Sequence, residues 1–473
     1  MNFHRHFAID RPPVETCIVG TGGFGRSFLA QGLRVPRMKC RVAVDVDAET
    51  AAAALASVGV EPHRIHVCTT PAEAAAAFAA GDFIAVGDLA VVVDLPIDVV
   101  VEATGHPEAG ARHARLALEA GHHLAVVSKE LDSVVGPGLA RLAASKGKVS
   151  TPVDGDQPSL LIGLITWAET LGFEIIAAGK SSEYDFVFDS KTGLLTSNGR
   201  TISAPAMADY LSTGDHSAAE IVARRAEVAA MLPQRAVPDL CELLIVSNAC
   251  GFAPDRADLH APIARTLEVP TLLAGVAEGG LLSGERRIDV FHCLRTPDEP
   301  SFAGGVFVVV RCTDRETWDM LAEKGHVVSR SGATAMLYLP RHLLGLEAAT
   351  TILEAALLGA SSGGTDPRPH LDLIARATQD LPAGGVLTMG GHHHMIDGTV
   401  GELIPAAALE PETPAPFYLA ANRRLVRDVA RGSIIAMADI EIPADSELLA
   451  LRRYQDSAFF GQSATTGKVA EHA

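Results

Sequence analysis

Short apolar runs alternate with helical stretches from residue 14 to residue 154. Parallel strands joined by crossover helices give this alternation, so the pattern predicts an α/β fold with a Rossmann-type, doubly wound parallel sheet. The apolar stretch at 83–95 fits the rhythm less well; it is compatible with an extra hairpin and stays unassigned. The predicted strands are 16–20, 41–46, 98–104, 122–128 and 148–153, and the predicted helices are 24–33, 48–57, 107–120 and 138–146.

The pattern changes after residue 155. Asp156 and Pro158 predict the cap and first turn of a helix that ends near Leu171. A segment rich in glycine, serine and proline, 360–369, predicts a linker, so another domain is expected from about residue 370. The region 185–300 is ambiguous. Further predicted strands are 173–179, 305–312 and 335–339, and a further predicted helix is 345–358.

Composition narrows the functional classes. The chain has 473 residues, which favours two to four domains. With 39 basic and 57 acidic residues its net charge is -18, a balance that repels nucleic acid and anionic lipid. Seven widely spaced cysteines are predicted to be reduced core residues. The charged, proline-containing start and the lack of an apolar run of ~20 residues favour a cytoplasmic protein without a membrane span.

The motif GTGGFG at residues 20–25 separates the first predicted strand from the first predicted helix. In that context glycines let backbone amides and a helix N-terminus approach a pyrophosphate, whereas glycines alone would indicate only a sharp turn. Asp45 lies 20 positions after Gly25, at the end of the second strand, where a carboxylate can accept ribose hydroxyls. The sequence therefore predicts a dinucleotide site. Its predicted residues are Gly20, Gly22, Gly23, Phe24, Gly25, Asp45, Thr104, Gly105 and Lys129.

Asp45 also bears on the choice between NAD and NADP. A carboxylate beside a 2′-phosphate is repulsive, and Val46 and Asp47 follow it instead of an arginine. These charges favour NAD. A basic side chain from elsewhere, such as Arg26 or Arg41, could still reach the adenosine end, so both cofactors stay open.

Two segments after later strands carry candidate catalytic groups. Thr104 and Gly105 follow the strand DVVVEAT and are predicted to line the nicotinamide ribose, the alternative being an ordinary turn. Lys129 ends the strand in VVSKEL, with Glu130 beside it to orient it. An ammonium there would polarise a substrate carbonyl and deliver a proton if burial lowers its pKa toward neutrality. The alternative for Lys129 is a solvated loop lysine.

A second polar cluster follows the strand FEIIAAGK, which opens the second domain. Lys180 with Ser181 and Ser182 could grip a substrate carboxylate or phosphate, and Glu183 could accept a proton. A polar loop is the other interpretation. Asp154 and Asp156 are predicted to face the same cleft, although Asp156 is equally well explained as a helix cap.

Three consecutive histidines, His392 to His394, suggest a metal. Adjacent residues on an extended chain alternate faces, so only the first and third could share one. A polar loop is the favoured interpretation.

Several motifs resemble known oxidoreductases. GTGGFG, VVVEATGHPEAGARHA, VVSKE and DGDQPSL resemble the NAD(P)-binding half of homoserine dehydrogenase-like enzymes. AAGK at 177–180, LPRHLLGLE at 339–347 and RRLVRDVARGSIIAMADIEIP at 423–443 resemble oxidoreductases with a C-terminal SAF domain, among them the deoxyxylulose-phosphate reductoisomerase-like enzymes of some bacteria. Homoserine dehydrogenases place a lysine at the position of Lys129.

The resemblance implies three domains. A dinucleotide-binding domain would span 1–155, with 340–360 returning to it; a catalytic, substrate-binding and dimerising α+β domain would span 156–339; and a β-rich SAF-like domain would span 370–460. It also implies a homodimer. In its reductoisomerase-like version a divalent cation would clamp substrate oxygens. The carboxylates considered for that cation are Glu130, Asp154, Glu183 and Asp185.

The sequence thus predicts an NAD(P)-dependent oxidoreductase that moves hydride to or from a carbonyl or alcohol of a small anionic substrate. Homoserine dehydrogenase-like and reductoisomerase-like activities are the narrower versions, and a dehydrogenase of sugar-acid or semialdehyde catabolism is a further one. Two other classes stay open: a dinucleotide-binding sensor without turnover, and a cofactor-independent hydrolase or lyase.

Overall fold

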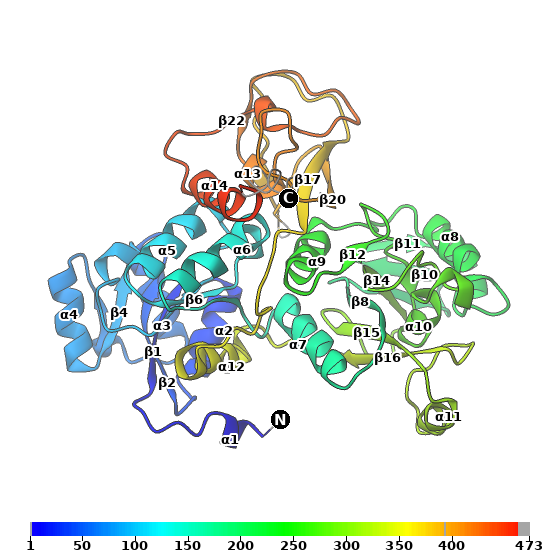
Figure 1. Ribbon diagram of the computed structural model, residues 1–473, viewed down its shortest axis with the longest axis horizontal. Helices are drawn as coiled ribbons and strands as arrows, with labels where there is room; N and C mark the ends of the chain where they lie inside the picture. Colours follow the sequence, from blue (N-terminus) through cyan, green and yellow to red (C-terminus); the bar gives the residue numbers. More distant parts are fainter. Residues whose placement is uncertain (1, 392–393, 462–473) are drawn as a thin grey trace, which may run out of the picture.

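A computed structural model gives the protein's architecture for residues 2–391 and 394–461 (Figure 1). In Figure 1 the first part, drawn in blue and cyan, lies beside a second, green part, and the C-terminal region, drawn in yellow to red, sits above both. No helix within these residues is long and apolar enough to cross a bilayer.

The first part is the predicted parallel sheet with crossover helices. Seven strands pair in the order β3-β4-β2-β1-β5-β6-β7, all parallel, so the strand order reverses between β1 and β5. Ligands of such sheets bind outside the carboxyl ends of the strands at that reversal. The strands are β1 (Val14–Val19), β2 (Met38–Val44), β3 (Ile65–Val67), β4 (Phe83–Val86), β5 (Val99–Glu102), β6 (His123–Val126) and β7 (Ser150–Pro152). The helices are α1 (Phe3–His6), α2 (Gly23–Gly32), α3 (Ala48–Ser57), α4 (Pro71–Ala80), α5 (Pro107–Glu119) and α6 (Lys129–Ser145).

One sequence prediction in this part is wrong, and one unassigned stretch is now defined. The stretch 83–95, left unassigned, is no hairpin, because β4 runs parallel between β3 and β2 and is followed by a 3-10 turn at Leu89–Val91. The helix predicted from residue 138 begins nine residues earlier, at Lys129, with Ser128 as its N-cap. Pro137 lies inside this helix. Since proline usually ends or kinks a helix, its presence hid the true start.

The second part is built on a mixed sheet in the order β11-β10-β9-β14-β8-β15-β16. Its central strand β8 pairs parallel with β14 and antiparallel with β15. The strands are β8 (Ile175–Ser181), β9 (Phe186–Asp189), β10 (Leu194–Ser197), β11 (Arg200–Ser203), β12 (Ala253–Pro254), β13 (Ile263–Ala264), β14 (Arg287–Arg295), β15 (Val306–Arg311) and β16 (Thr334–Leu339). The helices are α7 (Gln157–Thr170), α8 (Ala218–Val228), α9 (Val237–Cys250), α10 (Val269–Leu272) and α11 (Arg315–Glu323).

The chain then returns to the first part. The amide of Gly345 donates to Ser27 Oγ of α2 at 3.1 Å, and Ile352 and Leu353 are buried in the same core as β1 and β2. The predicted helix over 345–358 is instead a 3-10 turn (Leu344–Leu346), α12 (Ala349–Leu353) and one π-helical turn (Glu354–Leu358).

The C-terminal region consists of short strand pairs and one longer helix. Leu371–Ala377 pairs with Thr399–Pro405 along seven residues, and two shorter strand pairs, β18 with β19 and β21 with β22, are also antiparallel. The elements are β17 (Leu371–Ala377), β18 (Met389–Gly390), β19 (Met395–Ile396), β20 (Thr399–Pro405), α13 (Phe417–Ala420), β21 (Arg424–Leu425), β22 (Ile440–Glu441) and α14 (Glu447–Phe460). The α/β fold class predicted from the sequence is confirmed.

Candidate functional site

The glycines in the turn between β1 and α2 have two different roles. Gly20 has φ +92°, and a Cβ there would lie 2.6 Å from the carbonyl oxygen of Ala103; a Cβ on Gly25 would clash with the carbonyl oxygen of Gly20. These two close the turn against its neighbours. Gly22 and Gly23, the N-cap and first residue of α2, face open space, with nothing within 4 Å of an added Cβ. The first amides of α2 are therefore open to a ligand, and they form the positive end of the helix dipole.

A cavity of about 680 Å³ opens beside this turn. Gly20, Gly22, Asp45 and Thr104 are among the residues that line it. Asp45 Oδ2 accepts a hydrogen bond from the amide of Thr21 at 2.8 Å and another from its hydroxyl, and Oδ1 accepts from the amide of Val46 at 2.8 Å. The carboxylate is thus fixed at the cavity wall, next to the glycine turn. This position suits a ribose hydroxyl.

Neither arginine considered for a 2′-phosphate is tied to this cavity. Arg41 donates to Glu15 at 2.9 and 3.2 Å, and its guanidinium lies 4.2 Å from the centre of the Phe78 ring. It is thereby held away from the carboxyl end of β2. Arg26 is exposed on α2. Asp88, by contrast, lines the cavity together with Asp45.

Beyond Thr104 and Gly105, two lysines and two acids form a buried ionic network between the first and second parts. Lys129 Nζ lies 2.7 Å from Glu242 Oε1, and Glu242 Oε2 accepts from Lys180. Lys180 Nζ also lies 2.9 Å from Asp239 Oδ1. Asp239 and Glu242 are one turn apart on α9, which packs against α6 and so brings the acids to Lys129 (Figure 1). We call these four residues the cleft network.

The two lysines differ in exposure. The Lys129 side chain is 25% exposed, whereas that of Lys180, in the middle of the second sheet, is 3% exposed. A cation at a helix N-terminus opposes the helix dipole. Lys129, as the first residue of α6, is compensated by Glu242 and by acids of its own first turn. Lys129 is the member of the network that can meet a ligand.

The charges within the cleft network shift the pKa values of its side chains. Burial alone would lower the pKa of Lys129, but the carboxylates of Glu242, Asp156 and Glu130 outweigh it and raise that pKa well above its ordinary value. Lys180 behaves alike, with Asp239 and Glu242 raising its pKa against burial. Burial would raise the pKa of Glu242, yet the two ammonium groups lower it to about 2. The expectation that burial brings the pKa of Lys129 toward neutrality is therefore wrong.

Asp156 is a nearby acid whose pKa is raised. It caps α7, accepting from the amide of Gln157 at 2.9 Å, as the sequence predicts. Burial and the charge of Glu242 raise its pKa, against the opposing effects of Lys129 and His342. A second acid, Asp132 of α6, has its pKa raised to about 7 by burial and by Asp156.

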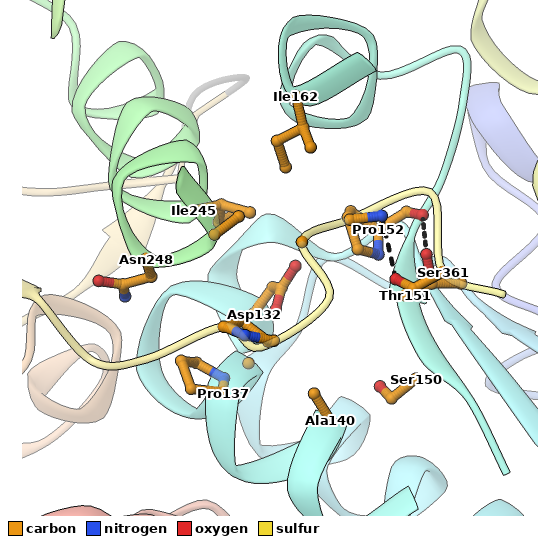
Figure 2. A pocket seen from close by; sticks show the side chains of 15 residues that line it. Asp132, Pro137, Ala140, Ser150, Thr151, Pro152, Ile162, Ile245, Asn248 and Ser361 are labelled. Atoms are coloured by element: carbon orange, nitrogen blue, oxygen red, sulfur yellow. Dashed lines mark hydrogen bonds between the residues drawn. The ribbon is translucent and has the colours of Figure 1, made fainter. Parts of the chain in front are cut away.

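Asp132 borders a cavity of about 30 Å³, the size of a water molecule (Figure 2). Figure 2 shows it between α6, α7 and α9, with Ile162, Ile245 and Asn248 around it. The cavity adjoins the segment that leads from α12 and the π-helical turn, packed on the first part, to the C-terminal region.

The remaining predicted residues are distributed around this centre. Ser182 Oγ donates to Asp239 Oδ2 at 2.8 Å and so joins the network. The buried Ser181 donates its hydroxyl to the carbonyl oxygen of Ser182 at 3.3 Å. Thr104 Oγ1 donates to Glu102, and the Gly105 amide donates to Ser128 Oγ at 2.8 Å. Phe24, in the first turn of α2, packs partly buried against the core.

The carboxylates considered for a divalent cation do not converge. Asp154 accepts from the hydroxyls of Ser159 and Thr350, and Asp185 accepts from Arg295. Glu130 pairs with His394, and Glu183 lies exposed after β8. Within residues 2–391 and 394–461 no three metal-binding side chains come together. His392 and His393, which the idea of a metal on the histidine run involves, lie outside the described residues.

Asp239 and Glu242 are the site residues that sequence reasoning missed. They lie in the ambiguous region 185–300, on a helix that is buried nearly throughout. Two acids three residues apart inside such an apolar stretch, VPDLCELLIV, are a usable signal, because buried carboxylates need cationic partners.

Comparison with known proteins agrees with this picture. Residues 155–348 match the family model described as oxidoreductase DRL, catalytic domain. No curated protein matches significantly. The match shows an oxidoreductase catalytic domain, and it adjoins the dinucleotide fold of the first part. The predicted enzyme class, an oxidoreductase, is confirmed.

Several solved structures are similar at low identity. Biliverdin reductase from Synechocystis shares 21% identity over 37% of this chain and 48% of its own (TM-score 0.24). Myo-inositol dehydrogenase from Lactobacillus casei shares 17% over 38% and 48% (TM-score 0.26), so this chain spans about half the length of each. The dehydrogenase MviM from Clostridium difficile shares 10% over 74% and 92% (TM-score 0.34). Similarities this low do not identify a substrate.

Proposed function

We propose that the protein transfers hydride between NAD or NADP and a carbonyl or alcohol carbon of a small polar substrate bound at Lys129. The observation that carries the proposal is the cleft network. Its partly exposed member, the charged Lys129, begins the helix that follows β6, and the residue before it, Ser128, accepts a hydrogen bond from the Gly105 amide. A nicotinamide nucleotide, when bound, supplies or accepts the hydride.

Lys129 is the proposed electrophile. Its ammonium, held protonated chiefly by Glu242, would stabilise the negative charge that develops on the substrate oxygen. Asp156, whose pKa is raised, is the proposed neighbouring proton reservoir. Because Lys129 keeps its positive charge and does not titrate freely, its main contribution is electrostatic stabilisation.

Lys180 receives a different role from the substrate grip inferred from the sequence. Its ammonium contacts Asp239 and Glu242 and is almost fully buried. We therefore assign it as a positioning residue that holds Glu242 toward Lys129. The two lysines and two carboxylates of the cleft network balance in charge, and Glu130 adds a further negative charge beside Lys129, so an anionic substrate would have only the exposed side of Lys129 to attract it.

The narrower activities come from the sequence resemblance. Homoserine dehydrogenase-like reduction needs only the hydride-transfer site. The deoxyxylulose-phosphate reductoisomerase-like version needs a cation among carboxylates that are engaged elsewhere, so we derive no step through a metal and place hydride transfer first. The SAF-like nature of residues 370–460 and a homodimer stay proposals on the same resemblance.

The test is an absorbance assay of the reduced nicotinamide with hydroxy acids, semialdehydes, sugar phosphates and their uncharged analogues. We expect turnover with one of these classes. Binding of nucleotide without turnover would instead indicate a sensor, and conversion without nucleotide would indicate a hydrolase or lyase.

The lysine is tested in the same assay. Lys129→Ala should lower turnover at least ~100-fold while cofactor affinity stays nearly unchanged. Lys146→Ala, which removes an exposed lysine from the other end of α6, is the matched control and should leave both quantities unchanged. Equal activities of the two variants would contradict the assignment of Lys129.

A further inference from the structure

We propose that His394 of the C-terminal region is a positioning residue of the hydride-transfer site, acting on Lys129 through Glu130. The inference deepens the proposed function and rests on it. Its starting point is a contact across 264 positions of sequence: His394 Nδ1 lies 2.7 Å from Glu130 Oε1.

Both partners of this ion pair touch the site. Glu130 follows Lys129 in the first turn of α6 and is 4% exposed. The His394 ring lies against Gly105, where an added Cβ would be 2.7 Å from its Cε1. The Gly105 amide in turn donates to Ser128 Oγ, the N-cap of α6. The imidazole therefore contacts both turns, after β5 and after β6, between which the nicotinamide end is proposed to bind.

Hydrogen bonds attach the C-terminal region to the first part, and they hold His394 beside Glu130 and Gly105. Gln455 of α14 accepts from the amide of Gly138 at 2.9 Å and donates to the carbonyl of Val134 at 3.3 Å. Arg423 and Ser446 both donate to Glu108 of α5, at 2.5 and 2.8 Å. The fold thus anchors this region on α5 and α6, the helices that begin at the two turns.

His394 can couple the site to pH. The hydrogen bond to Glu130 raises the pKa of His394, burial lowers it, the charge of Glu130 raises it and that of Lys129 lowers it, with a net rise. The charges acting on the ring come from α6, and the β5–α5 turn presents the backbone of Gly105. When the ring loses its proton, the negative charge of Glu130 is no longer balanced and acts more strongly on Lys129.

Kinetics test the role. His394→Gln should lower kcat by about ten- to hundredfold, because the first turn of α6 loses its support, with little change in nucleotide affinity. The alkaline limb of the wild-type pH profile that belongs to His394 should disappear. His394→Lys, which keeps a permanent cation near Glu130, should recover most of the activity and also lack that limb. His63→Gln, at an exposed site, should match the wild type in both respects.

A measurement independent of turnover separates this inference from the proposed function. The ring signals of His394, assigned by their loss in His394→Gln, are titrated by NMR in the full-length protein. Glu130→Gln should lower the pKa of His394. A titration unaffected by Glu130→Gln, or a wild-type pH profile in His394→Gln, overturns the inference. If the wild type transfers no hydride at all, the proposed function fails and the role of His394 in it fails too, while the NMR titration still decides whether the ion pair exists.

Discussion

Two buried ionic networks in this protein use different cations. In the C-terminal region Arg452, with a fully buried side chain, lies 2.6 and 2.8 Å from the two oxygens of Asp372 and 2.8 Å from Asp456, and it donates to the carbonyl of Ala407. We call this the arginine clamp. It holds α14 to β17. The cleft network instead uses two lysines that share Glu242, and one of them is a quarter exposed.

This difference distinguishes an ionic network that stabilises the fold from one that can interact with a ligand. Guanidinium groups present several fixed donors, and those of Arg452 meet protein acceptors, which suits a permanent joint. A lysine carries a compact charge on a flexible stem. Because Glu242 keeps Lys180 as a partner, Lys129 can turn toward a ligand without leaving a buried carboxylate unpaired.

The largest expected effect is on the arginine clamp. Arg452→Leu leaves Asp372 and Asp456 buried without their cation, so the free energy of unfolding should fall by about 3–5 kcal/mol. Urea unfolding measures it. Arg453→Leu, the next residue and an exposed one, is the control and should change stability by less than about 0.5 kcal/mol. Similar stabilities of the two variants would show that the clamp is not a structural joint.

The second prediction divides the cleft network between its lysines. Lys180→Met leaves the buried Asp239 without its cation and Glu242 with Lys129 alone, and we expect a loss of about 3 kcal/mol in unfolding free energy. Lys129→Met should cost less than about 1 kcal/mol, because Glu242 retains Lys180. Urea unfolding of both variants decides it. A larger loss for Lys129→Met than for Lys180→Met would reverse their assignment as acting and holding residues.

Sequence patterns predict the first part of this molecule better than they predict the candidate functional site. The glycine turn, Asp45 and the strand ends at Thr104 and Lys129 follow from local rules, since each element is set by its own residues. The start of α6 was misplaced because Pro137 is accommodated within a helix held by its neighbours.

The partners of the lysines depend on tertiary packing. Asp239 and Glu242 lie on α9, within a segment whose pattern was ambiguous, and reach Lys129 only because α9 packs on α6. His394 comes from a hairpin more than 260 positions away. Local periodicity does not encode contacts between residues that are far apart in the sequence. Two acids in an apolar helix are the one local signal that could have indicated buried cationic partners.

A third prediction concerns the nucleotide cavity. Its wall includes the charged side chain of Asp45, which has no cationic partner named above. Asp45→Ala should weaken NAD binding about tenfold, through loss of charged hydrogen bonds, and NADP binding less, because a repulsive carboxylate is also removed. Fluorescence titration with both reduced nucleotides gives the ratio of their dissociation constants. Glu49→Ala, an exposed site in the following helix, should leave it unchanged. An unaltered ratio in Asp45→Ala would mean that Asp45 serves the glycine turn alone.

A pH-dependent effect is expected at Asp132, a buried carboxyl whose neighbour is another acid. Its pKa of about 7 in the folded protein exceeds the value of about 4 in an unfolded chain, so the folded state holds the extra proton between these pH values. By linkage, this group's contribution to stability is complete below pH 4 and is lost as pH rises to 7. Asp132→Asn removes that loss. The stability of the variant relative to wild type should therefore grow by about 1–3 kcal/mol from pH 4 to pH 7 in urea unfolding. Asp10→Asn, at an exposed site, should show a constant difference. Parallel curves for Asp132→Asn and wild type would mean that the carboxyl is ionised beside Asp156 at low pH, and that a buried charge in this protein needs neither a lysine nor an arginine.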